Sequence, residues 1–354
     1  MPRKAHMTPP RFDPARPRLV RPVPVEPQGL RGPTRGQARG PHWRRTSCGY
    51  YVPADVDGDL VEQRIVEAGH HVSPDTAVTG WASLRWQGAT WFDGLGGDGR
   101  TPLAVQLTSI RRSVREQPGI AVTGECIPPP FRTVVDGLQV VVPVSAVAFE
   151  MRYADHLVAA VRAFDMAAAA DLVSCAELLR HLELLYHWTG IPVAREAAAL
   201  ADENAWSPRE VDVRLVWPLV LALEPPLTNR PVFDLEGRHL GTPDLLDVEA
   251  GLAVEYDGGL HLEGRQRAKD LVRADDLRRA GLEYLDLVGA DVREPLRLER
   301  RIREARGRAL ASRPGERRWT LELPGWWTPT HTVDLRRALS DDQRERLLRY
   351  RRAG

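Results

Sequence analysis

The stretch from Gly241 to His261 constrains the fold of this chain more than any other segment. It contains two short apolar runs, 245–248 and 251–256, separated by a turn that ends in glycine. Two such runs around a glycine turn predict a β-hairpin. The start of one hairpin strand lies beside the end of the other, so this hairpin would bring Asp244 next to Glu255.

The segments around the hairpin predict an α/β unit. Ser207 followed by Pro208 is typical of a helix start, and Gly281 is typical of a helix end. The expected order is a helix at 207–223, a three-stranded meander at 230–256, a helix at 264–280, a strand at 282–288 and a helix at 295–310.

Acidic residues and a histidine gather at the end of the second apolar run, where Glu255, Asp257 and His261 follow one another closely. Hard divalent cations prefer oxygen ligands, and Mg²⁺ needs only one or two carboxylates besides water and substrate phosphate. The pattern therefore predicts a Mg²⁺ or Mn²⁺ site held by Asp244, Glu255 and Asp257. His261 would act there on water or on the scissile phosphate, which is the arrangement of a phosphodiesterase.

Each of these residues also has an ordinary structural interpretation. Asp244 follows a proline, and Asp257 precedes two glycines, so both suit turns. A lone histidine such as His261 is usually a surface residue. A functional role is the better interpretation of Glu255, because this residue lies inside an apolar run where an unpaired carboxylate would be costly.

The ordered set of these residues resembles the very-short-patch-repair-like endonuclease branch of the PD-(D/E)XK superfamily. The resemblance spans about residues 207–310. It implies a restriction-endonuclease-like αβββαβ core and Mg²⁺-dependent hydrolysis of DNA phosphodiester bonds. The matching positions are Pro243-Asp244, Glu255-Tyr256-Asp257-Gly258-Gly259 with His261, Asp270 with Arg273, and Gly281.

One position departs from the superfamily pattern. Asp257 stands where the pattern has a lysine, and aspartate supplies no positive charge. The resemblance implies that His261 takes over this role, as a histidine does in that branch. Lys269, on the next predicted helix, is a second candidate, with a solvated helix face as its alternative. The resemblance also implies a metal-site carboxylate on the first helix at Glu210, which alternatively completes a capping box with Ser207.

The composition bounds the class of protein. A chain of 354 residues with a net charge of +1 predicts a soluble protein of two or three domains. Its three widely spaced cysteines form neither a metal-ligand pattern nor a disulfide framework, which favours a reducing, cytoplasmic location. No apolar run is long enough to span a bilayer, so no membrane partner is expected.

Four segments are predicted along the chain. Residues 1–43, rich in arginine, proline and glycine, are expected to be a disordered tail. Residues 44–204 predict a mixed α/β domain, 205–312 the nuclease-like domain, and 313–354 an extension that packs on it. The arginines of the tail and of the helices after the hairpin suit phosphate, and the alternative is a solvated face with acidic partners.

The 44–204 segment resembles the body of AbiEi-family antitoxins and transcriptional regulators, through Arg44–Pro53, Ser73–Leu84 and Val144–Glu150. That resemblance implies DNA binding and a toxin or regulatory protein partner. A recognition helix before the wing is not expected, because residues 28–40 are too rich in glycine, proline and arginine. Two functions therefore follow: a metal-dependent DNA endonuclease, or an AbiEi-like regulator with an inactive nuclease-like domain. A third reading is an inactive relic kept as an assembly scaffold.

Overall fold

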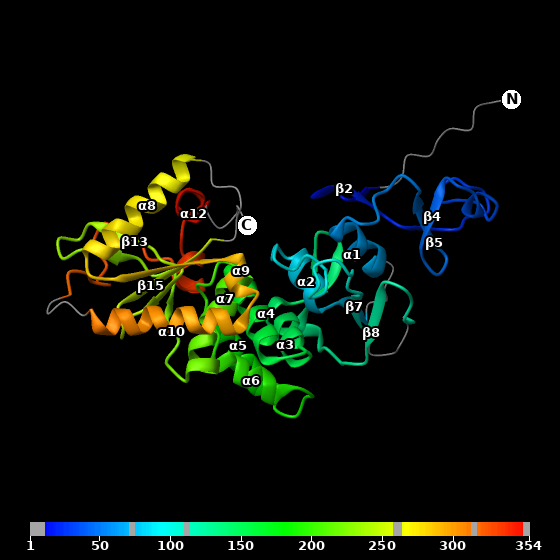
Figure 1. Ribbon diagram of the computed structural model, residues 1–354. Helices are drawn as coiled ribbons and strands as arrows, with labels where there is room; N and C mark the ends of the chain where they lie inside the picture. The colour runs from blue at the N-terminus through cyan, green and yellow to red at the C-terminus, as the bar shows by residue number, and fades with distance from the viewer. Residues whose placement is uncertain (1–10, 71–74, 110–113, 258–263, 313–316, 350–354) are drawn as a thin grey trace. The chain divides into compact units, whose positions relative to one another are not determined.

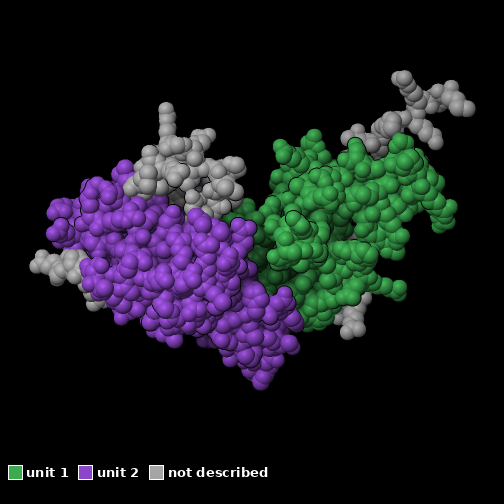
Figure 2. Space-filling model, in the orientation of Figure 1, with its two compact units in different colours: residues 1–150 green, residues 151–354 purple. Residues whose placement is uncertain are grey.

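The computed structural model describes residues 11–70, 75–109, 114–257, 264–312 and 317–349 (Figure 1). The side chains of Asp257 and of residues 264–271 lie outside that description. The protein is a mixed α/β protein with several small sheets. It divides into two compact units, residues 1–150 and 151–354 (Figure 2). Within the described residues, no helix combines the length and apolar character that crossing a bilayer requires.

The first unit begins with a folded segment, so the prediction of a disordered tail is wrong for residues 11–43. Phe12 and Leu19 are buried in the core of the unit, and the side chain of Gln63 hydrogen-bonds both backbone groups of Val20. These few anchors hold a segment whose composition is otherwise that of a disordered chain. Its elements are β1 (Arg11–Asp13), β2 (Arg16–Val20), β3 (Val23–Pro24), a 3₁₀ turn (Gln37–Arg39), β4 (Trp43–Ser47) and β5 (Tyr50–Pro53).

A five-stranded sheet with order β8-β7-β6-β10-β9 forms the centre of the first unit. The hairpin of β9 and β10 turns at Asp136 and Gly137, which both have positive φ, as such tight turns require. Helices α1 (Val61–Gly69) and α2 (Gly80–Trp86) pack on the sheet, and α3 (Pro143–Arg152) follows it. The strands are β6 (Thr76–Val78), β7 (Val105–Ser109), β8 (Ile120–Thr123), β9 (Arg132–Val135) and β10 (Leu138–Val141).

The second unit starts with a helical layer that the sequence had assigned to the preceding domain. The predicted boundary at 204–205 therefore differs from the observed one at 150–151. The reason is a buried ion pair, in which Arg214 of α7 contacts Asp165 of α4 at 2.6 Å. The helices are α4 (Leu157–Ala169), α5 (Cys175–Leu184), α6 (Ile191–Ala199) and α7 (Pro208–Arg214), followed by a π turn (Trp217–Leu221).

A four-stranded mixed sheet of order β11-β14-β15-β16 is the core of the second unit. The predicted hairpin is confirmed, since β14 and β15 pair antiparallel, while β15 and β16 run parallel. The three-stranded meander is wrong, because β12 and β13 form a sheet of their own. The strands are β11 (Leu227–Thr228), β12 (Val232–Phe233), β13 (His239–Gly241), β14 (Leu245–Asp247), β15 (Leu252–Asp257) and β16 (Glu283–Val288).

Helices cover both faces of this sheet. Residues alternate between the faces along each strand. Leu245 therefore packs with Ile302 of α10 (Pro295–Ala311), whereas its neighbour Leu246 packs with Leu277 of α8 (Gly264–Arg279). Figure 1 shows α8 and α10 on opposite sides of β15. A short helix, α9 (Gly289–Val292), joins β16 to α10.

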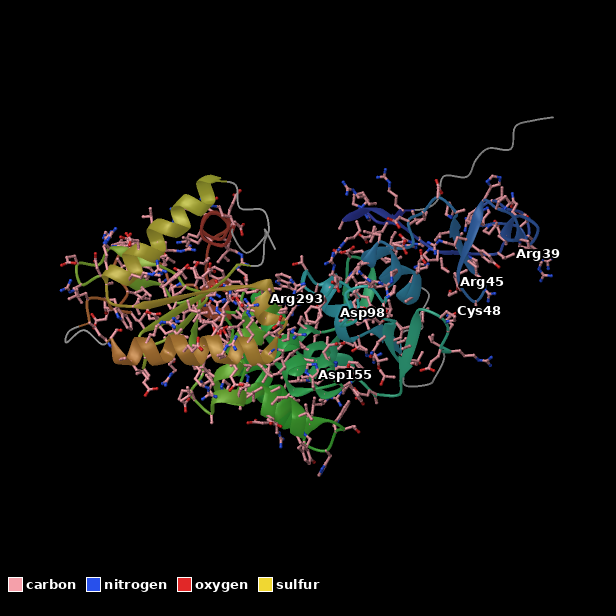
Figure 3. The ribbon with its side chains drawn as sticks, in the orientation of Figure 1. Arg39, Arg45, Cys48, Asp98, Asp155 and Arg293 are labelled. Carbon is pink, nitrogen blue, oxygen red and sulfur yellow. The ribbon has the colours of Figure 1, made fainter. Side chains whose placement is uncertain are left out.

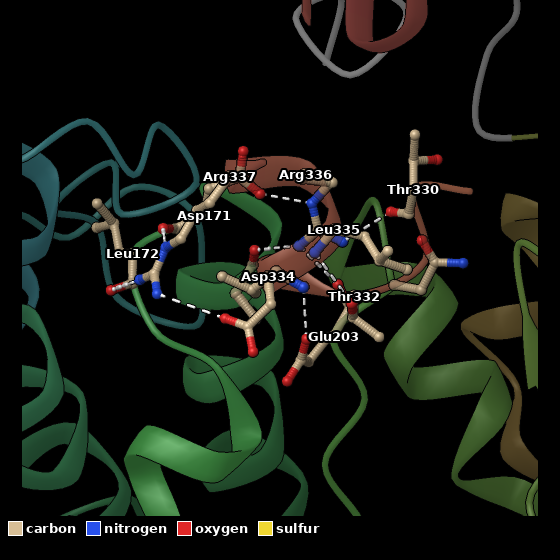
Figure 4. Close-up of polar contacts among 12 residues, drawn as sticks. Asp171, Leu172, Glu203, Thr330, Thr332, Asp334, Leu335, Arg336 and Arg337 are labelled. Atoms are coloured by element: carbon tan, nitrogen blue, oxygen red, sulfur yellow. Dashed lines mark hydrogen bonds and ion pairs between the residues drawn. The ribbon is translucent and has the colours of Figure 1, made fainter. Parts of the chain in front are cut away.

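The C-terminal extension is fastened to the helical layer by Arg336, a fully buried residue of α11 (Val333–Arg337). Its guanidinium contacts the Asp171 carboxylate at 2.5 Å and donates to the carbonyl oxygens of Ala168, Glu203 and Thr330 (Figure 4). The last helix, α12 (Asp341–Leu348), follows. The extension thus completes the second unit.

Replacing Arg336 with methionine is expected to destabilise the second unit by about 3 kcal/mol or more, because a buried ion pair and three carbonyl partners are lost. Urea unfolding followed by tryptophan fluorescence measures this change. Arg346→Met, which removes an exposed arginine of α12, is the matched control and is expected to have little effect. Equal stability of the two variants would contradict the fastening role.

Candidate active site

The hairpin register brings Asp244 and Glu255 together, as the sequence predicted. Leu245 pairs with Val254, so one further step places Asp244 opposite Glu255. The N–H of Tyr256 donates to Oδ2 of Asp244 at 2.7 Å. The carboxylate of Asp244 is thus fixed against the backbone of β15, at the end of the hairpin.

Glu210 approaches the same place from α7. Its N–H donates to the hydroxyl of Ser207 at 3.3 Å, so Ser207 caps the helix as predicted. The carboxylate of Glu210 does not complete the capping box, however, because it accepts the N–H of Trp206 at 2.9 Å instead of that of Ser207. The same carboxylate accepts a hydrogen bond from Nδ2 of Asn229, in the loop after β11, at 2.7 Å.

The electrostatics show that three carboxylates share this region. Burial is the main cause that raises the pKa of Asp244 well above its ordinary value, and the charges of Glu210 and Glu255 raise it further. The N–H of Tyr256 and the guanidinium of Arg273 act in the opposite direction. A buried carboxyl group whose pKa is raised by two acidic neighbours marks a candidate functional site.

Glu255 lies on the face of the sheet that α8 covers. Its carboxylate contacts the guanidinium of Arg273 at 2.5 Å. Burial, together with Glu255, raises the pKa of Tyr284. Gly241 makes room for Arg273, because a Cβ at that position would lie 2.9 Å from the Arg273 side chain.

The remaining predicted site residues are placed only in part. Asp257 ends β15, two residues after Glu255, and pairs in register with Val288. His261 lies outside the described residues. The backbone at Lys269 belongs to α8, and its side chain is outside the description. Among the side chains that the structure describes, no three acidic, histidine or cysteine residues form a ready cation cage.

Five of the six arginines of α10 form ion pairs with acidic residues. Arg306 contacts Asp247 at 2.9 Å, and Arg303 contacts Glu299 at 2.7 Å. Arg297 contacts the buried Asp291 at 2.7 Å. These pairs support the alternative interpretation of this helix as a face with acidic partners, rather than a surface reserved for phosphate.

One contributor, Asn229, was not predicted from the sequence, and for a second, Arg273, the partner was not predicted. Asn229 has a φ of +49°, a left-handed conformation that asparagine tolerates better than most residues, and this directs its amide to Glu210. An asparagine before Arg-Pro, between two apolar segments, was the available signal. Arg273 was noted as a motif match, yet its ion pair with Glu255 depends on tertiary packing.

Comparison of the chain with sequence models of protein families, with curated proteins and with solved structures found no match. The resemblances drawn from the motifs therefore stay proposals. The geometry of the carboxylates carries the functional argument alone.

Proposed function

We propose that the protein is a Mg²⁺- or Mn²⁺-dependent DNA endonuclease of the PD-(D/E)XK type. The observation that carries the proposal is the convergence of Glu210, Asp244 and Glu255 at one end of the sheet in the second unit. They come from a helix and from the ends of two paired strands. This is where the family resemblance places its metal-site carboxylates.

The order of elements supports the same proposal. Helix α7, strands β11, β14 and β15, helix α8 and strand β16 follow one another as αβββαβ, with the small β12–β13 hairpin as an insertion. The second and third strands of the core are antiparallel, and the third and fourth are parallel. Asp244 precedes the second strand, and Glu255 lies in the third.

The donor set suits a hard divalent cation. All candidate ligand atoms are carboxylate oxygens. Burial is the main cause of the raised pKa of Asp244, and the negative charges of Glu210 and Glu255, which a cation would offset, raise it further. Asp244 and Glu255 would hold the ion, with Asp257 beside them in the sequence. When bound, such an ion would neutralise charge on the phosphate and make water a better nucleophile.

The residues of this chain would divide the remaining work. Glu210 places a second negative charge near Asp244. The backbone N–H of Tyr256 fixes the orientation of the Asp244 carboxylate. Arg273 holds the carboxylate of Glu255 in place. His261, in place of the lysine that Asp257 replaces, would accept the proton of the attacking water near neutral pH, with Lys269 as the alternative.

A second candidate function has an observation in its favour. The guanidinium of Arg273 contacts the carboxylate of Glu255, and a guanidinium bound to a carboxylate competes with a metal ion for it. An inactive nuclease-like domain in an AbiEi-like regulator, gripping DNA or a toxin protein, would keep such an arrangement. An inactive domain kept as an assembly scaffold would do so as well.

Metal binding tests the proposal. Calorimetry is expected to show that the parent protein binds Mg²⁺ or Mn²⁺ and that Asp244→Asn does not. Because the pKa of Asp244 is raised, binding should release a proton and weaken as the pH falls below that pKa. Titrations in two buffers with different ionisation heats measure the proton. Equal binding by parent and variant would reject this assignment of the ligands.

A further inference from the structure

The segment 11–53 of the first unit, named here the N-terminal lobe, carries a large excess of positive charge. It contains nine arginines, against Asp13 and Glu26 as its only acidic residues. Both carboxylates already accept backbone hydrogen bonds, Asp13 from Ala15 and Glu26 from Leu30 and Arg31. The N–H of Arg31 is the main cause that lowers the pKa of Glu26.

Two of the nine arginines form ion pairs within the fold, and Arg21 and Arg45 donate to the backbone carbonyls of Phe12 and Ser47. Arg16 contacts Asp136 at 2.8 Å and stacks over Trp86, and Arg44 binds both oxygens of Glu67 on α1. The others are exposed, and none forms an ion pair with a carboxylate that the structure describes. These seven exposed arginines are Arg11, Arg18, Arg21, Arg31, Arg35, Arg39 and Arg45.

Two successive arginines of β4, Arg44 and Arg45, lie on opposite faces of the small sheet β3-β5-β4. Arg44 pairs in register with the buried Val52, and this inner face meets α1. The hydrogen bond to Glu67 is the main cause that raises the pKa of Arg44. The charges of Asp57 and Asp59, in the turn after β5, raise it further, so this acidic turn interacts with the inner face. Arg45 pairs with Tyr51 on the outer face, and Trp43 shares that face by alternation. Figure 3 shows Arg39 and Arg45 on this lobe.

A tight loop fixes the position of Arg31. The N–H of Glu26 donates to the carbonyl of Pro33 at 2.9 Å, which closes the loop onto β3. A Cβ at Gly32 would lie only 2.1 Å from the carbonyl oxygen of Pro24, so this close approach requires glycine. The loop is therefore a formed structure rather than a loose arginine-rich linker.

The same loop borders a hollow of about 550 Å³. Its apolar lining, called here the floor, includes Val23, Pro24 and the largely exposed Leu30. Arg21, Arg31 and His70 also line it, as does Glu26, whose carboxylate accepts the N–H groups of Leu30 and Arg31. Apolar surface beside guanidinium groups suits a ligand that has a flat apolar part and a phosphate.

We propose that the N-terminal lobe binds single-stranded nucleic acid. The exposed arginines contact the phosphates, and an unpaired base lies on the apolar floor of the hollow. Bases in a duplex are stacked inside it and are not available to such a floor, which is why a single strand is favoured. The proposal holds whether or not the carboxylate site of the second unit cleaves DNA.

Fluorescence anisotropy of the full chain with labelled oligonucleotides, in chelator so that no cleavage occurs, tests the lobe. The triple variant Arg31→Ala/Arg35→Ala/Arg39→Ala is expected to reduce the slope of log K against log salt by about 2 for a single strand. Its affinity at 0.1 M salt should fall about a hundredfold. The control Arg279→Ala/Arg303→Ala/Arg308→Ala removes the same charge from arginines in ion pairs, and is expected to change little.

A second variant tests the hollow without removing an arginine. Leu30→Glu should weaken binding of the single strand more than Leu296→Glu, which adds the same charge at another exposed leucine. An unchanged salt slope in the triple variant overturns the proposal. So does equal affinity for duplex and single strand, or displacement of the oligonucleotide by poly-L-glutamate at equal charge, which would indicate a generic acidic partner.

Discussion

Replacing His261 with alanine is expected to lower the rate of DNA cleavage by roughly two to four orders of magnitude, the scale of losing a general base. Under the proposed function, Asp257 stands where the pattern of the resembled superfamily has a lysine, so another residue would assist the attacking water. An imidazole with an ordinary pKa of about 6.5 accepts a proton near neutral pH. Single-turnover cleavage of a supercoiled plasmid measures the effect, and metal affinity should barely change.

Two further variants make this prediction specific. His187→Ala removes an exposed histidine of the second unit and should leave cleavage intact. Lys269→Ala tests the alternative base on α8. If cleavage survives His261→Ala and collapses in Lys269→Ala, the lysine carries the role and the assignment to His261 is wrong.

The second large effect is expected from Asp244→Asn, which keeps the shape of the side chain and its acceptor for the N–H of Tyr256. Loss of the metal should cost about 4 kcal/mol of transition-state stabilisation, or roughly a thousandfold in rate. The control is Asp275→Asn, on the exposed side of α8. Full activity of Asp244→Asn would show that the cluster of Glu210, Asp244 and Glu255 takes no part in the reaction.

The stability of Asp244→Asn separates lost chemistry from lost folding. The folded-state pKa of Asp244 lies above its unfolded value, so the folded protein binds more protons than the unfolded one. The parent therefore loses stability as the pH rises from about 4 through that raised pKa. Asparagine carries no such charge, and the metal-free variant should be the more stable protein above this window. An inactive but more stable variant identifies a functional carboxylate.

The hairpin and its two carboxylates could be predicted from sequence because the signals are local. A glycine turn between two apolar runs fixes the pairing of β14 with β15, and the pairing brings Asp244 to Glu255. Gly281, with a φ of +93°, ends α8 close to the expected residue. These features depend on a few neighbours in the chain.

The domain division and the folded N-terminal lobe depend on distant residues. The pair Asp165 with Arg214 and the buried Arg336 join helices to elements far along the chain, and neither leaves a periodic pattern. Phe12 and Leu19 are too few to alter the composition of their segment, yet they anchor it to the core. Likewise, the approach of Glu210 to Asp244 depends on where α7 docks.

The proposed metal-dependent nuclease activity can be measured directly as cleavage of supercoiled plasmid by the purified parent protein, with Mg²⁺ or Mn²⁺ and with chelator. Nicked or linear DNA is expected only when the metal is present, and neither is expected from Asp244→Asn. Intact plasmid at every metal concentration, from a parent protein that is folded, would contradict the proposed nuclease and leave the second unit as a binding domain.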